Sequence, residues 1–206
     1  LAVCMVIAML PVSAFAADNV TSGPCGDDAT WALTEDNNGD YTLTISGTGA
    51  MNDYSTAVAA PWSWAKHRIR AIAIGDEITA IGAYAFKGCD RFYAITIPAS
   101  VTTICQSAFQ SCTSLETIDL SNAINLKTIN LDAFHYFYNL NEVTIPSNVT
   151  SIGSKAFCNC ISLKRVTLLN GVQEIGSTAF MDCNSLKYVD IPESVTKIDA
   201  NAFAYC

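Results

Sequence analysis

The sequence is short of basic residues. Its 206 residues include 11 Lys and Arg against 19 Asp and Glu, which gives a formal net charge of −8. Proteins that hold a nucleic-acid backbone concentrate Lys and Arg on one face or segment, because release of phosphate counterions drives that binding. No segment of this sequence gathers its basic residues in that way. We therefore expect no nucleic-acid partner.

Residues that commonly carry chemistry are also scarce. The two histidines, His67 and His135, have no Cys or His partner at metal-site spacing. The sequence contains no GxSxG elbow, no GxGxxG fingerprint and no phosphate-loop lysine. Asp36, Asn38 and Asp40 alternate as calcium ligands do, but the Gly and Glu of such a loop are missing, which favours a hairpin turn. We expect no catalytic residue, cofactor or metal, and no enzymatic activity.

Long hydrophobic runs are absent after the first residues. Residues 1–16, LAVCMVIAMLPVSAFA, are apolar and small, and Ala14 and Ala16 stand at the two positions that a signal peptidase reads. We interpret this segment as a signal peptide, which predicts export. No later run reaches the roughly 18 apolar residues of a membrane helix, so we expect no membrane span in the mature chain.

The sequence does contain an internal repeat. An Ala-Phe pair recurs at steps of 23, 25, 23, 23 and 23 residues. The phenylalanines are Phe86, Phe109, Phe134, Phe157, Phe180 and Phe203. Three residues after them stand Cys89, Cys112, Phe137, Cys160, Cys183 and Cys206. One such unit cannot bury its own apolar columns, whereas stacked units bury one another's. The period therefore predicts a repeat solenoid with phenylalanine in its core.

Each unit also carries two aliphatic residues spaced by two, the spacing of inward positions in a strand. The pairs are Ile95 and Ile97, Ile118 and Leu120, Val143 and Ile145, Val166 and Leu168, and Val189 and Ile191. We predict one short strand per unit, stacked in parallel through residues 69–191. The unit after Phe109 is two residues longer and lacks a strand-ending proline, so we expect the register to bulge there.

The units AFCNCISLKRVTLLNGVQEIGSTAF and AFMDCNSLKYVDIPESVTKIDANAF resemble the BspA-type leucine-rich repeats of bacterial surface proteins. The resemblance covers residues 61–206 and implies a right-handed solenoid. It also implies a secreted or bacterial cell-surface location and a role in adhesion or in host and matrix binding. The array stops at Cys206 in mid-unit, so we expect the solenoid to be incomplete at its C-terminal end.

Residues 17–60 have a different pattern. Two expected strands, 31–33 and 41–46, flank the turn DNNGD. We interpret this region as a small β cap that covers the apolar N-terminal end of the solenoid.

The cysteine column permits two interpretations. Neighbouring strands about 4.8 Å apart would allow disulfides between Cys89 and Cys112 or between Cys160 and Cys183. However, Phe137 replaces Cys in one unit, which favours an apolar column of buried, reduced thiols.

The outward side of the strands is the candidate partner-binding face, because its side chains alternate with the core pairs and stack from unit to unit. Its residues are Tyr93, Thr96, Glu116, Asp119, Glu142, Thr144, Arg165, Thr167, Tyr188 and Asp190. We expect a monomeric binding or adhesion module whose partner is a protein or glycan on a host or matrix surface. Two alternatives stay open, a spacer that projects another domain of a longer surface protein and a plainly solvated face. A hydrolase that uses carboxylates of this face has the least support, because nothing in the sequence perturbs them.

Overall fold

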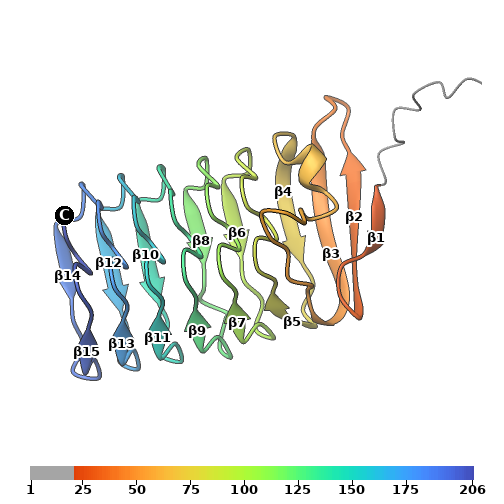
Figure 1. The fold of residues 1–206 in the computed structure, drawn as a ribbon. Helices are drawn as coiled ribbons and strands as arrows, with labels where there is room; N and C mark the ends of the chain where they lie inside the picture. Colours follow the sequence, from red (N-terminus) through yellow and green to blue (C-terminus); the bar gives the residue numbers. More distant parts are fainter. Residues whose placement is uncertain (1–20) are drawn as a thin grey trace, which may run out of the picture.

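The computed structural model describes residues 21–206, which form an array of stacked coils with strands in two rows (Figure 1). The predicted signal peptide, residues 1–16, lies outside the described residues. The N-terminal elements are β1 (Ser22–Pro24), β2 (Asp28–Glu35), β3 (Tyr41–Ala50), the 3-10 helix η1 (Ser63–Ala65) and β4 (Ile69–Ile74). One row then contains β6 (Ala94–Thr96), β8 (Thr117–Asp119), β10 (Glu142–Ile145), β12 (Arg165–Leu168) and β14 (Tyr188–Asp190). The other contains β5 (Ile78–Ile81), β7 (Thr103–Ile104), β9 (Thr128–Ile129), β11 (Ser151–Ile152), β13 (Glu174–Ile175) and β15 (Lys197–Ile198).

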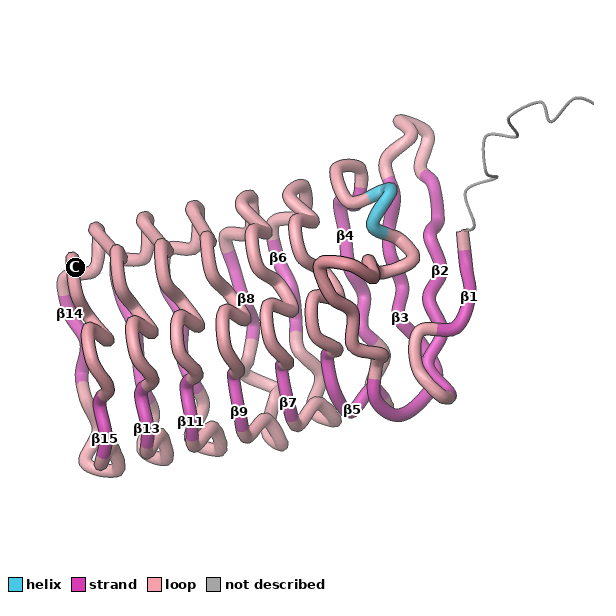
Figure 2. The backbone as a smooth tube through the Cα atoms, in the orientation of Figure 1, coloured by secondary structure: helices cyan, strands magenta, loops and turns pink. Residues whose placement is uncertain are grey.

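The predicted solenoid is confirmed, but each repeat contributes two strands and not one. The strands β6 to β14, which we call the first ladder, are the predicted ones. The strands β5 to β15, the second ladder, pair in parallel through a column of Ile residues, for example Ile104 beside Ile129, which is buried except at the exposed Ile198 in the last strand. Most of these strands are two residues long, too short to show a spacing of two in the sequence. Figure 2 shows the two ladders joined by loops.

The N-terminal hairpin continues the array. Strands β2 and β3 pair in antiparallel fashion, and β3 then pairs in parallel with both β4 and β5. At the hairpin turn the Asp36 carboxylate accepts the backbone N–H groups of Asn38 and Asp40 at 2.8 and 3.0 Å. The expected hairpin is therefore confirmed, and the Asp36 carboxylate stabilises its turn.

The core is built around a continuous column of aromatic rings, the aromatic spine. It consists of Trp62, Phe86, Phe109, Phe134, Phe157, Phe180 and Phe203. Successive phenylalanine centroids lie 5.0 to 5.6 Å apart in stacked orientation. All members except the half-buried Phe203 are fully buried. Burial of each ring contributes roughly 1.5–3 kcal/mol, so the spine is a main source of stability.

The cysteine column faces inward, as predicted, at Cys89, Cys112, Cys160 and Cys183. Its thiols also donate weak hydrogen bonds to the preceding coil's spine carbonyls, such as Cys112 to Phe86 at 3.2 Å and Cys183 to Phe157 at 3.3 Å. Burial raises the pKa of Cys112 well above its ordinary value, which keeps its proton in place for donation. Within residues 21–206 every cysteine is unpaired.

The first ladder is interrupted at the long unit, where the sequence predicts a bulge. Strand β8 pairs with β6, and β10 pairs with β12. In residues 21–206 no backbone hydrogen bond joins β8 to β10. The chain between β8 and β9, residues 120–127, has eight residues, against six in the corresponding segment 97–102. The second ladder stays continuous through β7, β9 and β11. The two extra residues therefore interrupt only the pairing of the first ladder.

Candidate functional site

The register of the first ladder sets the predicted face residues in rows. Strands β10, β12 and β14 align Glu142, Arg165 and Tyr188 in one row. They align Thr144, Thr167 and Asp190 in the next row, and strands β6 and β8 align Thr96 with Asp119. Tyr93 and Glu116 precede their strands and are joined by a backbone hydrogen bond of 2.8 Å. Eight of the ten predicted residues are exposed, while Asp119 and Thr167 are half-buried.

The expected stacking of this face from unit to unit is wrong at one point. The gap between β8 and β10 divides the ten residues into two groups. Tyr93, Thr96, Glu116 and Asp119 lie on the β6–β8 side, and the other six lie on the β10–β14 side. The physical reason is the longer segment after β8, which moves this coil out of hydrogen-bonding register with the next one.

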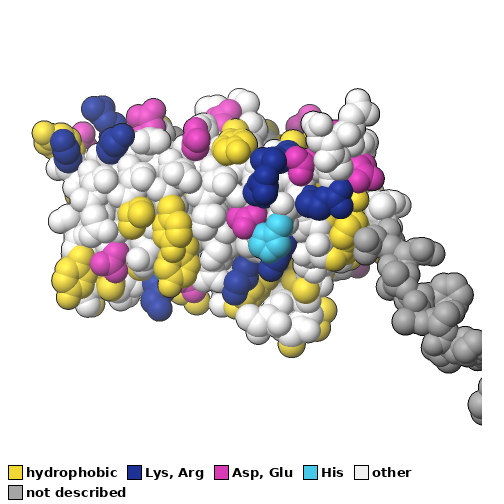
Figure 3. Space-filling model, turned by 90° about the horizontal axis from the view of Figure 1, so that it is seen from above, with side chains coloured by type: hydrophobic (Ala, Val, Ile, Leu, Met, Phe, Trp, Pro, Cys, Tyr) yellow, Lys and Arg dark blue, Asp and Glu magenta, His cyan; other side chains and the backbone are white. Residues whose placement is uncertain are grey.

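The face carries charges of both signs. Figure 3, which looks down on the array, shows acidic and basic side chains interspersed along one long edge, without a large field of one sign. The Ser121 hydroxyl and backbone N–H donate to the Asp119 carboxylate at 2.6 and 2.9 Å. These hydrogen bonds lower the pKa of Asp119, which is the opposite of what a general acid needs.

A groove of about 600 Å³ lies where the first ladder is interrupted. Three of the predicted face residues, Asp119, Glu142 and Thr144, line it. Its apolar lining includes Leu120, Val143, Pro146 and Leu169. The sequence analysis does not predict this groove, although the two additional residues of the unit mark its position.

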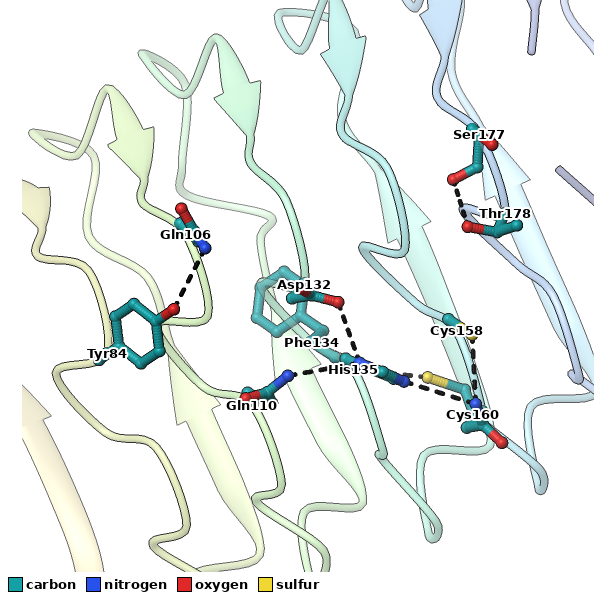
Figure 4. Close-up of polar contacts among 11 residues, drawn as sticks. Tyr84, Gln106, Gln110, Asp132, Phe134, His135, Cys158, Cys160, Ser177 and Thr178 are labelled. Atoms are coloured by element: carbon teal, nitrogen blue, oxygen red, sulfur yellow. Dashed lines mark hydrogen bonds and ion pairs between the residues drawn. The ribbon is translucent and has the colours of Figure 1, made fainter. Parts of the chain in front are cut away.

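A buried polar cluster lies on the turn side of the coils (Figure 4). His135 Nδ1 lies 3.0 Å from an Asp132 carboxylate oxygen, and Asn159 contacts both His135 Nε2 at 3.4 Å and the Cys158 sulfur at 3.2 Å. These two atoms are close enough for an ion pair. The Asp132 oxygen accepts no hydrogen bond, so the contact lacks hydrogen-bond geometry. The repeat thus brings Asp, His and Cys together from consecutive coils.

The electrostatics of this cluster do not activate a nucleophile. Burial raises the pKa of the Cys158 thiol, so the protonated form dominates. Burial also lowers the pKa of His135, more strongly than the nearby Asp132 raises it. With the imidazole of His135 and the thiol of Cys158 both neutral, the cluster has a packing role.

A family model described as the BspA type leucine-rich repeat region matches residues 63–183 and 127–206, with six copies. The chain belongs to this family. Leucine-rich repeats of this kind are a non-enzymatic repeat scaffold. No curated protein matches the chain.

Solved structures of bacterial leucine-rich repeat proteins are similar to this BspA-type chain. A leucine-rich repeat protein from Eubacterium ventriosum has 21% identity and a TM-score of 0.60, over 89% of this chain and 63% of that one. A leucine-rich cell surface protein from Faecalibacterium prausnitzii has 25% identity and a TM-score of 0.64, over 93% and 54%. A leucine-rich repeat protein from T. pallidum has 27% identity and a TM-score of 0.57, over 83% and 79%. The chain therefore spans less than two thirds of the first two proteins.

Among residues 21–206 no group of three or more His, Cys, Asp or Glu side chains is placed to hold a metal ion. In the same part of the chain, no helix has the length and apolar character needed to cross a membrane.

The buried His135 predicts a pH dependence of stability. Its pKa in the folded chain lies below the ordinary 6.5, because burial and Lys155 lower it more than Asp132 raises it. The unfolded chain therefore takes up this proton first as pH falls. Stability is full above about pH 6.5 and decreases below it. We expect thermal melts between about pH 7 and 5 to show a smaller loss of Tm for His135→Gln than for the parent.

The matched control is His67→Gln, which removes an exposed histidine paired with Asp90 at 2.9 Å. This variant tests whether a change in slope belongs to the buried imidazole and not to the loss of any histidine. A His135→Gln profile with the same slope as the parent would show that burial of the imidazole has no consequence for stability.

Proposed function

We propose that this BspA-type chain is an extracellular or surface-held binding module that acts as a monomer. Its partner is a protein or glycan on a host or matrix surface, contacted through the outward face of the first ladder. Leucine-rich repeat domains typically bind proteins, and the similar F. prausnitzii protein is a cell surface protein. The observation that carries the proposal is the set of exposed rows on β10, β12 and β14, whose register is fixed by backbone pairing.

The physical support lies in preorganisation. Side chains on paired strands lose little backbone entropy when a partner docks, which leaves more of the contact energy for affinity. The face also presents two exposed tyrosines, Tyr93 at 51% and Tyr188 at 71% exposure. Tyr and Arg are the residue types enriched among binding hot spots, and Arg165 lies beside Tyr188 in the register.

The test is a binding measurement with defined probes. The purified chain is screened by surface plasmon resonance against collagen, laminin and fibronectin and on a glycan array. We expect a Tyr188→Ala, Arg165→Ala double variant to weaken any interaction found by about tenfold or more, since hot-spot truncations cost more than about 1 kcal/mol. Its Tm should stay within a degree or two, because exposed substitutions change stability by about 0.5 kcal/mol or less.

The matched control is a Lys197→Ala, Gln173→Ala double variant, which removes two exposed residues on the side of the second ladder. It should bind like the parent. If the control loses binding and the face variant keeps it, the face is not the binding surface. If the chain binds no probe, the spacer function replaces the binding function.

A further inference from the structure

The loop between β3 and η1, residues 51–62, runs beside the first coils (Figure 2). Hydrogen bonds fix both of its ends to the same coil. At one end the Ala83 N–H donates to the Asp53 carboxylate at 2.7 Å. At the other end the Trp62 indole N–H donates to the Ala85 carbonyl at 2.9 Å. The loop is therefore held against the coil at two points.

A pocket of about 410 Å³ lies between this loop and the coil. Its volume is that of a small-ligand site, and the two fixed ends of the loop preform it. Two lysines and four serine or threonine residues line it, and no acidic residue does. No residue of the first ladder lines it either. The pocket is thus a positively charged site separate from the predicted binding face.

The two lysines of the pocket, Lys66 and Lys87, have no anionic partner within the chain. Across residues 21–206 no ion pair includes either of them. Two acidic residues of adjoining segments make other contacts: Asp53 accepts a backbone N–H, and the Asp90 carboxylate lies 2.9 Å from His67 Nδ1. An anionic ligand would therefore meet two ammonium groups that no carboxylate neutralises.

Contacts at the pocket wall position both lysine side chains. Lys66 is half-buried, and its Nζ lies 3.8 Å from the point where a side chain at Gly88 would begin. The missing side chain of Gly88 leaves the space that Lys66 occupies. Lys87 Nζ lies over the ring of Tyr84, 5.0 Å from its centroid. Gly88 and Tyr84 both line the pocket, so the two charges are held at the same site.

The hydroxyl groups of the pocket keep protons that a ligand can accept. Ser55 Oγ accepts the backbone N–H groups of Ala57 and Val58 at 3.2 and 3.0 Å. The Tyr84 hydroxyl accepts the Gln106 side-chain amide at 3.2 Å. A hydroxyl can donate one hydrogen bond while it accepts others. Both groups can therefore donate to a ligand without losing these contacts.

We propose that this pocket binds an acidic saccharide, whose carboxylate or sulfate group contacts Lys66 and Lys87 and whose hydroxyl groups contact the serine and threonine side chains. A lysine ammonium suits either oxyanion, because it is a compact charge with three rotatable donors. The net charge of −8 opposes this binding only weakly. Exposed charges more than about 8 Å apart are largely screened at physiological ionic strength.

A saccharide fits this pocket better than an acidic peptide does. Peptide recognition commonly uses free backbone groups of the receptor. In the coil that lines the pocket, the N–H groups of Tyr84, Phe86 and Gly88 all donate to carbonyls of the next coil, at 3.0, 2.7 and 2.8 Å. The pocket therefore offers a ligand mainly side-chain hydroxyls and ammonium groups, which match the hydroxyls and the oxyanion of an acidic sugar.

The experiment measures binding to the full chain by isothermal titration calorimetry. The probes are sialyllactose, a sulfated heparin disaccharide, neutral lactose and hexaglutamate. At least one acidic saccharide should bind about tenfold or more tightly than lactose, because its oxyanion adds charge-assisted hydrogen bonds. A preference for the heparin disaccharide supports a sulfate ligand, and a preference for sialyllactose supports a carboxylate ligand.

A Lys66→Gln, Lys87→Gln double variant should lose about tenfold or more in affinity for that saccharide, since each lysine contributes a charge-assisted hydrogen bond. The matched control is Lys127→Gln, Lys155→Gln, which removes the same charge from two exposed lysines outside the pocket. It should change the affinity less than about twofold, because distant exposed charges are screened.

A further variant tests the shape of the pocket without changing its charge. Ser111 lines the pocket with a φ of 64°, and Tyr136 has a φ of 67° at the corresponding position of the next coil. This backbone therefore accommodates tyrosine. Ser111→Tyr should fill the pocket and lower the affinity about tenfold or more, as loss of a whole contact surface does. Circular dichroism checks that the fold is retained.

Four results would each overturn the proposal. They are no binding of either acidic saccharide, equal binding of lactose, equal binding of hexaglutamate, and an affinity that neither the lysine double variant nor Ser111→Tyr lowers. The Tyr188→Ala, Arg165→Ala variant of the first ladder should bind the acidic saccharide like the parent. Failure of the pocket can therefore be distinguished from failure of the binding face.

Discussion

Replacement of Phe157 by alanine is expected to lower the free energy of unfolding by about 3–5 kcal/mol. The ring is fully buried and stacks between Phe134 at 5.1 Å and Phe180 at 5.3 Å. Its removal opens a cavity between two coils whose backbones are fixed by pairing on both ladders, so the site cannot easily collapse. Urea denaturation followed by circular dichroism measures the loss.

The matched control is Phe203→Ala, which removes the same side chain from the half-buried end of the spine. It should cost clearly less than Phe157→Ala. Hydrogen exchange gives a second measurement, because stability in a repeat array is a sum of nearest-neighbour terms. Loss of the Phe157 interface should expose the amides of residues 163–206 first. Equal costs at the two positions would show that stacking along the spine is not cooperative.

The parts of the fold that could be predicted are those that repeat in every unit. A column of Phe at a fixed period has one structural explanation, stacked coils that bury it, and the pairs spaced by two locate the strands of the first ladder. The outward face follows from the same alternation. The hairpin was predictable from its turn residues, although the parallel pairing of β3 with β4 and β5 was not, because nothing local records it.

The parts that could not be predicted depend on contacts between coils. A two-residue strand such as Thr128–Ile129 has no periodicity of its own, so the second ladder was not expected. The cysteine column is readable as apolar, but its hydrogen bonds to spine carbonyls require the three-dimensional register. Asp132 and His135 are three residues apart in one coil, but Asn159 and Cys158 join them only because consecutive coils align.

The candidate groove shows a different limit of sequence reasoning. The two additional residues predict an irregularity in the array. Whether one ladder or both lose strand pairing there depends on which segment contains the extra length. The second ladder is hydrogen-bonded on both sides of β9 and keeps its register. The first ladder therefore contains the irregularity, at the step between β8 and β10.

At the other end of the spine, Trp62→Ala is expected to cost about 3–5 kcal/mol, as Trp truncations in cores do. Trp62 is fully buried and stacks on Phe86 at 5.9 Å. It also makes edge contacts with Trp31 at 5.6 Å and Tyr54 at 5.7 Å, and its indole N–H donates to the Ala85 carbonyl at 2.9 Å. The residue thus joins the N-terminal hairpin to the first coils.

The location of the damage distinguishes Trp62 from Phe157. For Trp62→Ala, hydrogen exchange should show early loss of protection in residues 21–60, while the coils after Phe109 stay protected, because each interface in the array supports only its neighbours. Trp62→Phe is the matched control: it keeps a smaller aromatic ring but removes the N–H and leaves the buried Ala85 carbonyl without that donor, so it should cost about 1–3 kcal/mol, less than Trp62→Ala. If Trp62→Ala instead unprotects all coils together, the array unfolds as one cooperative unit. In that case the hairpin would be part of the same unit as the repeats, and the Phe157 variant should lose protection over the same residues.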